Sequence, residues 1–118
     1  MNQICRDIFR AIHEGKWLKI EYRNKADQVT KYWIGIRDID PRSRTMKVDG
    51  LHLGQLTIGE YDRIFIDSIL STEIIEGTYC PENKILVEDI EMHPERYKNI
   101  FDSSAGCKHT VQALTTLD

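Results

Sequence analysis

The stretch that decides the fold is DRIFIDSILSTEIIE, residues 62–76. It is extended and rich in β-branched residues, and its strand pattern breaks at Asp67-Ser68 before it resumes. Residues 63–66 and 69–75 are therefore predicted to be the last two strands of a sheet. What this sheet packs against depends on the residues that precede it.

An amphipathic helix is predicted over residues 4–13, ahead of every strand. Asn2 is suited to the N-cap of this helix, and Gly15 is suited to the left-handed residue that follows it. Residues 17–22 then alternate apolar and polar side chains, which is typical of a half-buried strand with one solvated face. The helix has one apolar stripe to lay against that strand, formed by Ile4, Ile8, Ala11 and Ile12.

More strands follow along the chain. Residues 29–39 read as a long strand, and Gly35 inside it is expected to bend or bulge the strand. A third strand begins at residue 45 and is predicted to break at Asp49-Gly50, with short strand pieces over residues 51–58. We therefore expect an α+β fold in which an N-terminal helix packs on a small antiparallel β-barrel, residues 1–77.

The remainder, residues 78–118, is expected to be an acidic, mainly helical extension. Helices are predicted over residues 81–90 and 94–101, although a strand through residues 85–87 stays open because the apolar residues there do not form one stripe. In the second helix Tyr97, Ile100 and Phe101 share a face. Residues 110–117 are a further candidate helix that ends without a cap, so the chain is expected to be the N-terminal piece of a longer protein.

Composition and charge bound the class of protein. A chain of 118 residues with 41% hydrophobic and 30% charged residues is an ordinary soluble domain. It has no signal-peptide pattern and no apolar run of the roughly 18 residues that a membrane span needs, so we expect a cytoplasmic protein. The net charge of −3 is unevenly spread, because residues 1–52 hold 11 Lys/Arg and 7 Asp/Glu whereas residues 53–118 hold 5 and 12.

No pattern in the chain indicates catalysis or a cofactor. Nucleophile elbows, phosphate-binding glycine loops and zinc-protease motifs are all missing from the sequence, so we expect no enzyme. The three cysteines are widely and irregularly spaced, which does not suit a disulfide framework. The pair Cys107 and His109 has no second pair beside it, and a closed zinc site needs four ligands, so no metal site is expected either.

Binding chemistry is better represented. Aromatic residues alternate with basic ones on the first two predicted strands, where Trp33 lies among Lys19, Arg23, Lys31 and Arg37. Rings that stack on bases and cations that take phosphates are what single-stranded nucleic acid requires. Strand aromatics are, however, more often packed against neighbouring strands, and alternation sends Tyr32 and Trp33 to opposite faces. At most one of those two rings faces a ligand.

The order of elements resembles the WYL domain family, whose Sm-like (SH3-like) small β-barrel is preceded by a helix. The resemblance covers residues 4–77 and rests on WLKIEY at residues 17–22 and IFIDSILSTEI at residues 64–74. The name-giving tripeptide falls at residues 46–48, which read MKV, and two arginines of the late strand are replaced by Asp62 and Ser68. Arg63 is one residue away from the first of them, so strand alternation would point it to the other face.

The resemblance implies a non-catalytic, ligand-sensing or nucleic-acid-binding regulatory module of a larger bacterial protein that acts in transcription or on nucleic acid. Its partner would be single-stranded nucleic acid or a nucleotide-like ligand, bound by Lys19, Arg23, Lys31, Trp33, Arg37 and Arg63. The alternative is a degenerate barrel kept for contact with another protein, for a homodimer or for docking within its own chain. That alternative predicts an exposed apolar patch near Leu51, Leu53 and Leu56.

Overall fold

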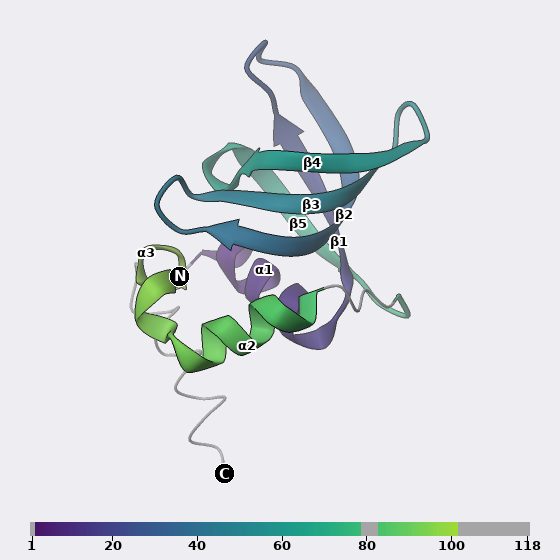
Figure 1. Ribbon diagram of the computed structural model, residues 1–118. Helices are drawn as coiled ribbons and strands as arrows, with labels where there is room; N and C mark the ends of the chain where they lie inside the picture. Colours follow the sequence, from purple (N-terminus) through teal and green to yellow (C-terminus); the bar gives the residue numbers. More distant parts are fainter. Residues whose placement is uncertain (1, 79–82, 102–118) are drawn as a thin grey trace.

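The computed structural model describes residues 2–78 and 83–101. These residues fold as an N-terminal helix, α1 (Gln3–Glu14), followed by a five-stranded antiparallel sheet that is open. The segments α2 (Lys84–Met92), η3 (Pro94–Tyr97) and α3 (Lys98–Phe101) come next. Figure 1 shows these helices gathered below the sheet, while the turns at residues 24–28 and 53–56 project away from them.

Helix α1 has the ends that the sequence predicts. The Asn2 side chain accepts a hydrogen bond from the backbone N–H of Cys5 at 2.9 Å, which satisfies one of the free donors of the first turn. Gly15 ends the helix in the left-handed conformation, with φ of 64°. In the last turn, Nδ1 of His13 lies 3.0 Å from the carbonyl oxygen of Phe9, and the two rings stack.

The sheet has the strand order β4-β3-β2-β1-β5, so each strand pairs with its neighbour in sequence except β5, which pairs with β1. Strand β4 is followed by a 3₁₀ turn, η1 (Ile66–Ser68), which confirms the predicted interruption at Asp67-Ser68. The strands are β1 (Trp17–Arg23), β2 (Val29–Asp40), β3 (Thr45–His52), β4 (Thr57–Phe65) and β5 (Ile69–Ile75).

The predicted break at Asp49-Gly50 is wrong, because β3 runs through both residues without interruption. Gly50 has a packing role instead: a Cβ at this position would lie 2.7 Å from Cε2 of the Tyr61 ring, which leans over it from β4. The chain reverses at residues 53–56, where Leu56 has a positive φ of 55°. The short strand pieces expected over residues 51–58 are therefore the end of β3, a turn and the start of β4.

A bulge interrupts the pairing of β2 with β3, as the sequence suggests, but two residues after Gly35. The register shifts between Ile36 and Asp38, which leaves Arg37 as the extra residue on β2. A bulge changes the direction of the side chain it carries, and the guanidinium of Arg37 donates hydrogen bonds to Asp49 on β3 and to Glu60 on β4.

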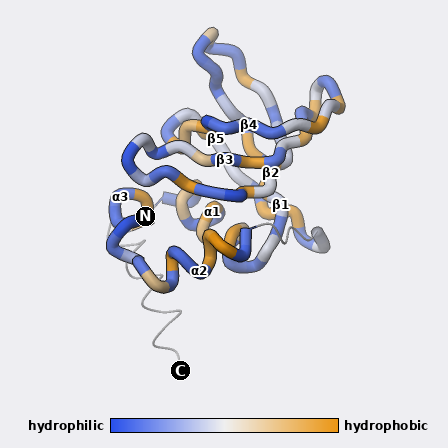
Figure 2. The backbone as a smooth tube through the Cα atoms, viewed as in Figure 1, coloured by the Kyte–Doolittle hydropathy of each residue, from blue (hydrophilic) through white to orange (hydrophobic). Residues whose placement is uncertain are grey.

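The core lies between one face of the sheet and the helices, and we call this the inner face. Figure 2 shows hydrophobic segments in α1 and α2 below the sheet, and a largely hydrophilic β1–β2 turn. Residues 84–92 are helical, which settles the ambiguity at 85–87. Both predicted units contribute to one core, whose fully buried side chains include Ile8, Ile12, Leu18, Ile20, Ile34, Met46, Val48 and Ile100.

Polar contacts tie the segment after β5 to the N-terminal half of the chain. Thr78 accepts a hydrogen bond from the backbone N–H of Trp17 at 3.1 Å, and buried Asn83 donates to the carbonyl oxygen of Ile12. The Tyr97, Ile100 and Phe101 side chains are buried together, which confirms that they share a face. The predicted helix at 110–117 and the pair Cys107 and His109 lie outside the described residues.

Candidate binding surface

The face of the sheet opposite the helices, which we call the outer face, carries most of the predicted site residues. Side chains alternate along a strand, and Leu18, Ile20 and Ile34 are buried on the inner face, so their neighbours point outward. Lys19 lies directly opposite Trp33 in the pairing of β1 with β2. The register therefore brings together Lys19, Arg23, Lys31 and Trp33, with Arg37 at the bulge.

Arg63 also points outward, because its neighbour Ile64 is buried, but it lies on β4, two strands away from β2. It is exposed on β4, and its guanidinium carbon lies 5.5 Å from the centroid of the Phe65 ring. Within residues 2–78 and 83–101, no hydrogen bond or ion pair joins Arg63 to the other five predicted residues. Its side chain packs locally against an aromatic ring.

Each of the four predicted cations on β1 and β2 has an acidic neighbour. The Nη1 atom of Arg37 lies 3.0 Å from a carboxylate oxygen of Glu60 and 3.3 Å from one of Asp49. Arg23 pairs with Asp27 at 3.3 Å. The Arg23–Asp27 pair is exposed and the pairs of Arg37 are partly exposed, so each contributes little to stability, but they cancel charge locally.

Lys19 and Lys31 have acidic residues opposite them in the strand pairing. Lys19 lies opposite Glu73 in the pairing of β1 with β5, and Lys31 lies opposite Glu21 in the pairing of β1 with β2. Side chains directly opposite one another are about 5 Å apart at Cβ, close enough for opposite charges to interact. The outer face is therefore a mixed surface rather than a basic one, although the first half of the chain is basic in sequence.

Between these charges runs a band of apolar side chains, which we call the apolar stripe. The register sets Ile58 of β4 opposite Leu51 of β3, and Leu51 opposite Trp33 of β2. The stripe continues diagonally to Trp17, which lies opposite Ile75 on β5. Ile58 is 82% exposed and the others are half-buried. Leu56 in the β3–β4 turn, 75% exposed, extends the apolar region at one end.

Tyr32 points the other way, as strand alternation predicts. Its ring meets three others edge-on, with centroid separations of 5.0 Å to His52, 5.3 Å to Tyr61 and 6.4 Å to Tyr22. Burial, together with the neighbouring Tyr32, raises the pKa of Tyr61. The rings touch each other, so this cluster closes the end of the core, and of the neighbouring pair Tyr32 and Trp33 it is Trp33 that faces a partner.

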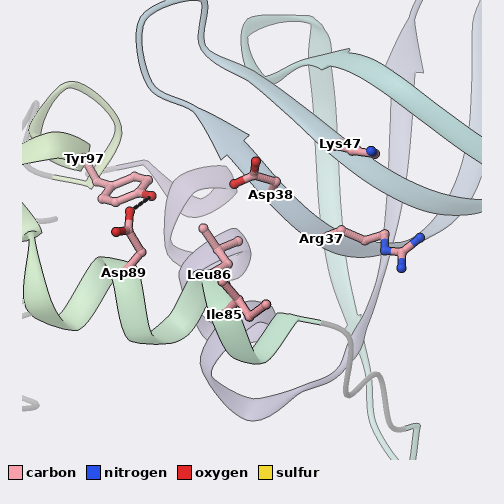
Figure 3. A pocket seen from close by; sticks show the side chains of 7 residues that line it. All are labelled: Arg37, Asp38, Lys47, Ile85, Leu86, Asp89 and Tyr97. Atoms are coloured by element: carbon pink, nitrogen blue, oxygen red, sulfur yellow. Dashed lines mark hydrogen bonds between the residues drawn. The ribbon is translucent and has the colours of Figure 1, made fainter.

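A cleft of about 420 Å³ separates α2 and η3 from the bulged end of β2. In Figure 3 Arg37 and Lys47 lie at one end of it, and Tyr97 and Asp89 lie at the other. Tyr97 donates a hydrogen bond to Asp89, which lowers the pKa of that carboxyl group, while burial and the same bond raise the pKa of the phenol. The polar groups at this end therefore satisfy each other.

Other chemistry is sparse in the part of the chain that the structure describes. Cys5 is buried, and this burial raises the pKa of its thiol. No group of three or more His, Cys, Asp or Glu side chains among the described residues is arranged to hold a metal ion. No helix among them is long and apolar enough to cross a membrane.

Comparison with models of known protein families and with curated proteins finds no match to this chain. The resemblance to the WYL family therefore stays a prediction from the sequence. The register and the mixed charge of the outer face are what sequence reasoning missed. The leucines near residues 51–56 were a usable signal for the apolar stripe, but their alignment with Trp33 and Trp17 required the strand pairing.

Proposed function

We propose that this chain is a non-catalytic binding module and that the outer face of its sheet is a contact surface for another protein. The observation that carries the proposal is the apolar stripe. Ile58, Leu51 and Trp33 lie side by side on three neighbouring strands and continue to Trp17. Aligned apolar and aromatic side chains on a sheet face, with charges along both edges, are the composition of a protein interface core and its polar rim.

The balance of charge favours a protein over a nucleic acid. Nucleic acids present a line of phosphates, so surfaces that bind them gain most of their affinity from uncompensated Lys and Arg. Here Arg37 is shared by Asp49 and Glu60, and the two lysines face Glu21 and Glu73 across the strand pairs. A phosphate chain laid on this face would meet about as many carboxylates as cations.

Single-stranded nucleic acid, or a nucleotide-like ligand, is the second candidate, and one observation favours it. Lys19 lies directly opposite the half-buried Trp33. One aromatic face beside one cation is the minimum arrangement for a stacked base and its phosphate. The resemblance to the WYL family supports the same ligand class, and with it a regulatory role in a larger bacterial, cytoplasmic protein.

We further propose that the sheet is a small barrel of the Sm-like type, as the resemblance implies. The strand order leaves β4 and β5 at the two edges, which are the strands that closure would bring together. Only the turn η1 separates them in sequence. The backbone N–H of Phe65 donates to the hydroxyl of Tyr22, which joins the end of β4 to β1, the strand next to β5.

The test uses three forms of the protein as bait: wild type, Ile58→Glu and Ile85→Glu. Ile58 and Ile85 are 82% and 81% exposed, so both variants replace a solvated isoleucine by a carboxylate, but Ile85 lies on α2, where it lines the cleft and is not part of the apolar stripe. Each bait is offered the soluble proteins of cells that make this chain, a second copy of the chain with a different tag, and labelled DNA and RNA single strands.

A protein retained by wild type and by Ile85→Glu, but lost with Ile58→Glu, supports the proposal. Oligonucleotide binding that weakens steeply with salt and is lost with Lys19→Ala would instead support the second candidate, because phosphate contacts release counterions. Identical capture by all three baits would show that the outer face is not the contact surface.

A further inference from the structure

Strand β4 is an edge of the sheet, and part of its backbone has no hydrogen-bonding partner on the open side. It pairs with β3 alone, whereas β5 at the other edge is tied to α1 by the hydrogen bond from Thr72 to Asp7. The far end of β4 is occupied, because the backbone N–H of Phe65 donates to the hydroxyl of Tyr22. In the part of the chain that the structure describes, the backbone of residues 57–61 bonds to β3 and to nothing else.

The direction of the main-chain groups follows from the bonds around the turn between β3 and β4. The backbone N–H of Leu53 donates to the carbonyl oxygen of Lys31 on β2 at 2.9 Å. Main-chain groups of successive residues in a strand point to opposite sides, so the preceding residue, His52, faces β4. Its carbonyl oxygen accepts a hydrogen bond from the backbone N–H of Leu56 in the turn at 2.7 Å. Every second residue of β3, counted back from His52, therefore bonds to β4.

The register carries this alternation over to β4. Gly50 is one of the residues of β3 that face β4, and Gly59 lies opposite it, so the main-chain groups of Gly59 bond to β3. Its two neighbours, Ile58 and Glu60, therefore direct their N–H and C=O groups away from β3. An unpaired row of N–H and C=O groups is a template for another extended chain.

A bulge bounds this open edge. The register shift between Met46 and Val48 sets residues 62–63, both charged, opposite a single residue of β3. Bulges and charged side chains are usual protections of a sheet edge, but this bulge lies beyond residues 57–61. That segment is about 16 Å long, close to the length of a common strand. Closure of the sheet at Phe65 leaves the segment free, because the bulge lies between them.

The side chains around the open edge indicate what kind of chain fits it. Ile58 is 82% exposed and stands on the outer face, at one end of the apolar stripe. Gly59 belongs to the inner face, two residues from Tyr61, and a Cβ added to it would meet no heavy atom within 4 Å. A neighbouring strand can therefore place an apolar side chain beside Ile58 and a bulky ring over Gly59.

Resting on the proposed function, we propose that the partner of this surface contributes an extended segment, which adds to β4 as a further strand of the sheet. The segment exchanges about four main-chain hydrogen bonds with Ile58 and Glu60. It carries a β-branched or other apolar residue opposite Ile58 and an aromatic residue opposite Gly59. The main-chain bonds supply affinity, and these two side chains supply specificity.

The probes are peptides selected on the whole 118-residue chain from a phage-displayed library of random peptides, then labelled for fluorescence anisotropy. They are titrated with wild type, Glu60→Ala and Glu60→Pro. Both variants remove the carboxylate that pairs with Arg37, but only proline also removes the N–H at the open edge. Because that N–H points away from β3, both variants should fold, which circular dichroism and thermal unfolding check.

Strand addition predicts that Glu60→Ala binds within about twofold of wild type and that Glu60→Pro binds about tenfold more weakly or worse, since a main-chain bond is lost. Methylation of the peptide's own backbone nitrogens tests the geometry on wild-type protein alone. Binding should be lost at every second residue of the peptide and retained at the residues between them. A library that yields no peptide with this pattern overturns strand addition.

The outcomes also separate this inference from the proposed function. If Ile58→Glu abolishes capture of a protein while Glu60→Pro, correctly folded, leaves it intact, strand addition is overturned and the contact surface stays in place. Capture that is indifferent to both substitutions overturns both.

Discussion

Gly50 provides the sharpest test of the packing on the inner face. An added Cβ would lie 2.7 Å from Cε2 and 2.8 Å from Cδ2 of the Tyr61 ring, whereas carbon atoms in contact prefer about 3.5–4.0 Å. In Gly50→Ala the ring must therefore move by about 1 Å, and it already packs edge-on against Tyr32 with centroids 5.3 Å apart. Overpacking of this kind costs about 1–3 kcal/mol.

A smaller effect opposes that cost. Replacing glycine by alanine where the backbone permits it stabilises a protein by about 0.4–1 kcal/mol, because the unfolded chain loses freedom. We therefore expect Gly50→Ala to lower the free energy of unfolding by about 1–2 kcal/mol in urea titrations. In a Tyr61→Ala background the clash is gone, so the same change should be neutral or stabilising.

Gly59 is the matched control, since it lies opposite Gly50 on β4 and an added Cβ there has no heavy atom within 4 Å. Gly59→Ala should leave the free energy of unfolding unchanged or raise it slightly. An equal cost at Gly50 and Gly59, or a cost at Gly50 that persists without the Tyr61 ring, would refute the account of this packing.

Three further results are expected from urea unfolding. Thr72→Val should lower the free energy of unfolding by about 1.5–3 kcal/mol, because Thr72 donates a 2.7 Å hydrogen bond to the buried carboxylate of Asp7. A Thr72→Ser variant that loses the same stability would contradict this role of the hydroxyl group. Below about pH 4 the wild type should lose stability more steeply than Tyr97→Phe as the pH falls. The hydrogen bond from Tyr97 lowers the pKa of Asp89 in the folded protein, so its contribution to stability is present above the unfolded pKa and disappears as the pH falls through the folded pKa. Parallel stability curves for the two proteins would refute this. Arg44→Gln should lower the free energy of unfolding by no more than about 1 kcal/mol, because the Arg44 guanidinium and the Asp67 carboxylate, 3.0 Å apart, are both partly exposed. A larger loss would contradict this view of the ion pair as a surface contact.

Local patterns in the sequence were sufficient for the elements whose cause is local. The caps of α1 at Asn2 and Gly15, the opposite directions of Tyr32 and Trp33, and the interruption at Asp67-Ser68 all follow from neighbouring residues, and the structure confirms them. The predicted break at Asp49-Gly50 failed for the opposite reason. Gly50 is required by the ring of Tyr61, which packs against it from 11 positions further along the chain, and no local pattern contains that contact.

In the candidate site too, local patterns predicted the direction of the side chains but not their long-range partners. Alternation alone places Lys19, Lys31 and Trp33 on one face, and the structure agrees. Their charge environment depends on partners that only the register supplies: Arg37 meets carboxylates 12 and 23 positions away. The uneven charge of the sequence does not contain these partners, because folding brings acidic residues of β3, β4 and β5 next to the cations of β1 and β2.

The most direct test of the contact surface uses the two tryptophans of the chain, Trp17 and Trp33, which both lie on the outer face. Oxidation of the two indole rings by hydroxyl radicals is measured by mass spectrometry for wild type, Ile58→Glu and Ile85→Glu, each alone and after mixing with the soluble proteins of cells that make this chain. The account predicts that mixing protects both rings in wild type and in Ile85→Glu, but not in Ile58→Glu, because contact with a partner removes the rings from water. Equal oxidation with and without those proteins in all three forms would contradict the claim that the outer face is a contact surface.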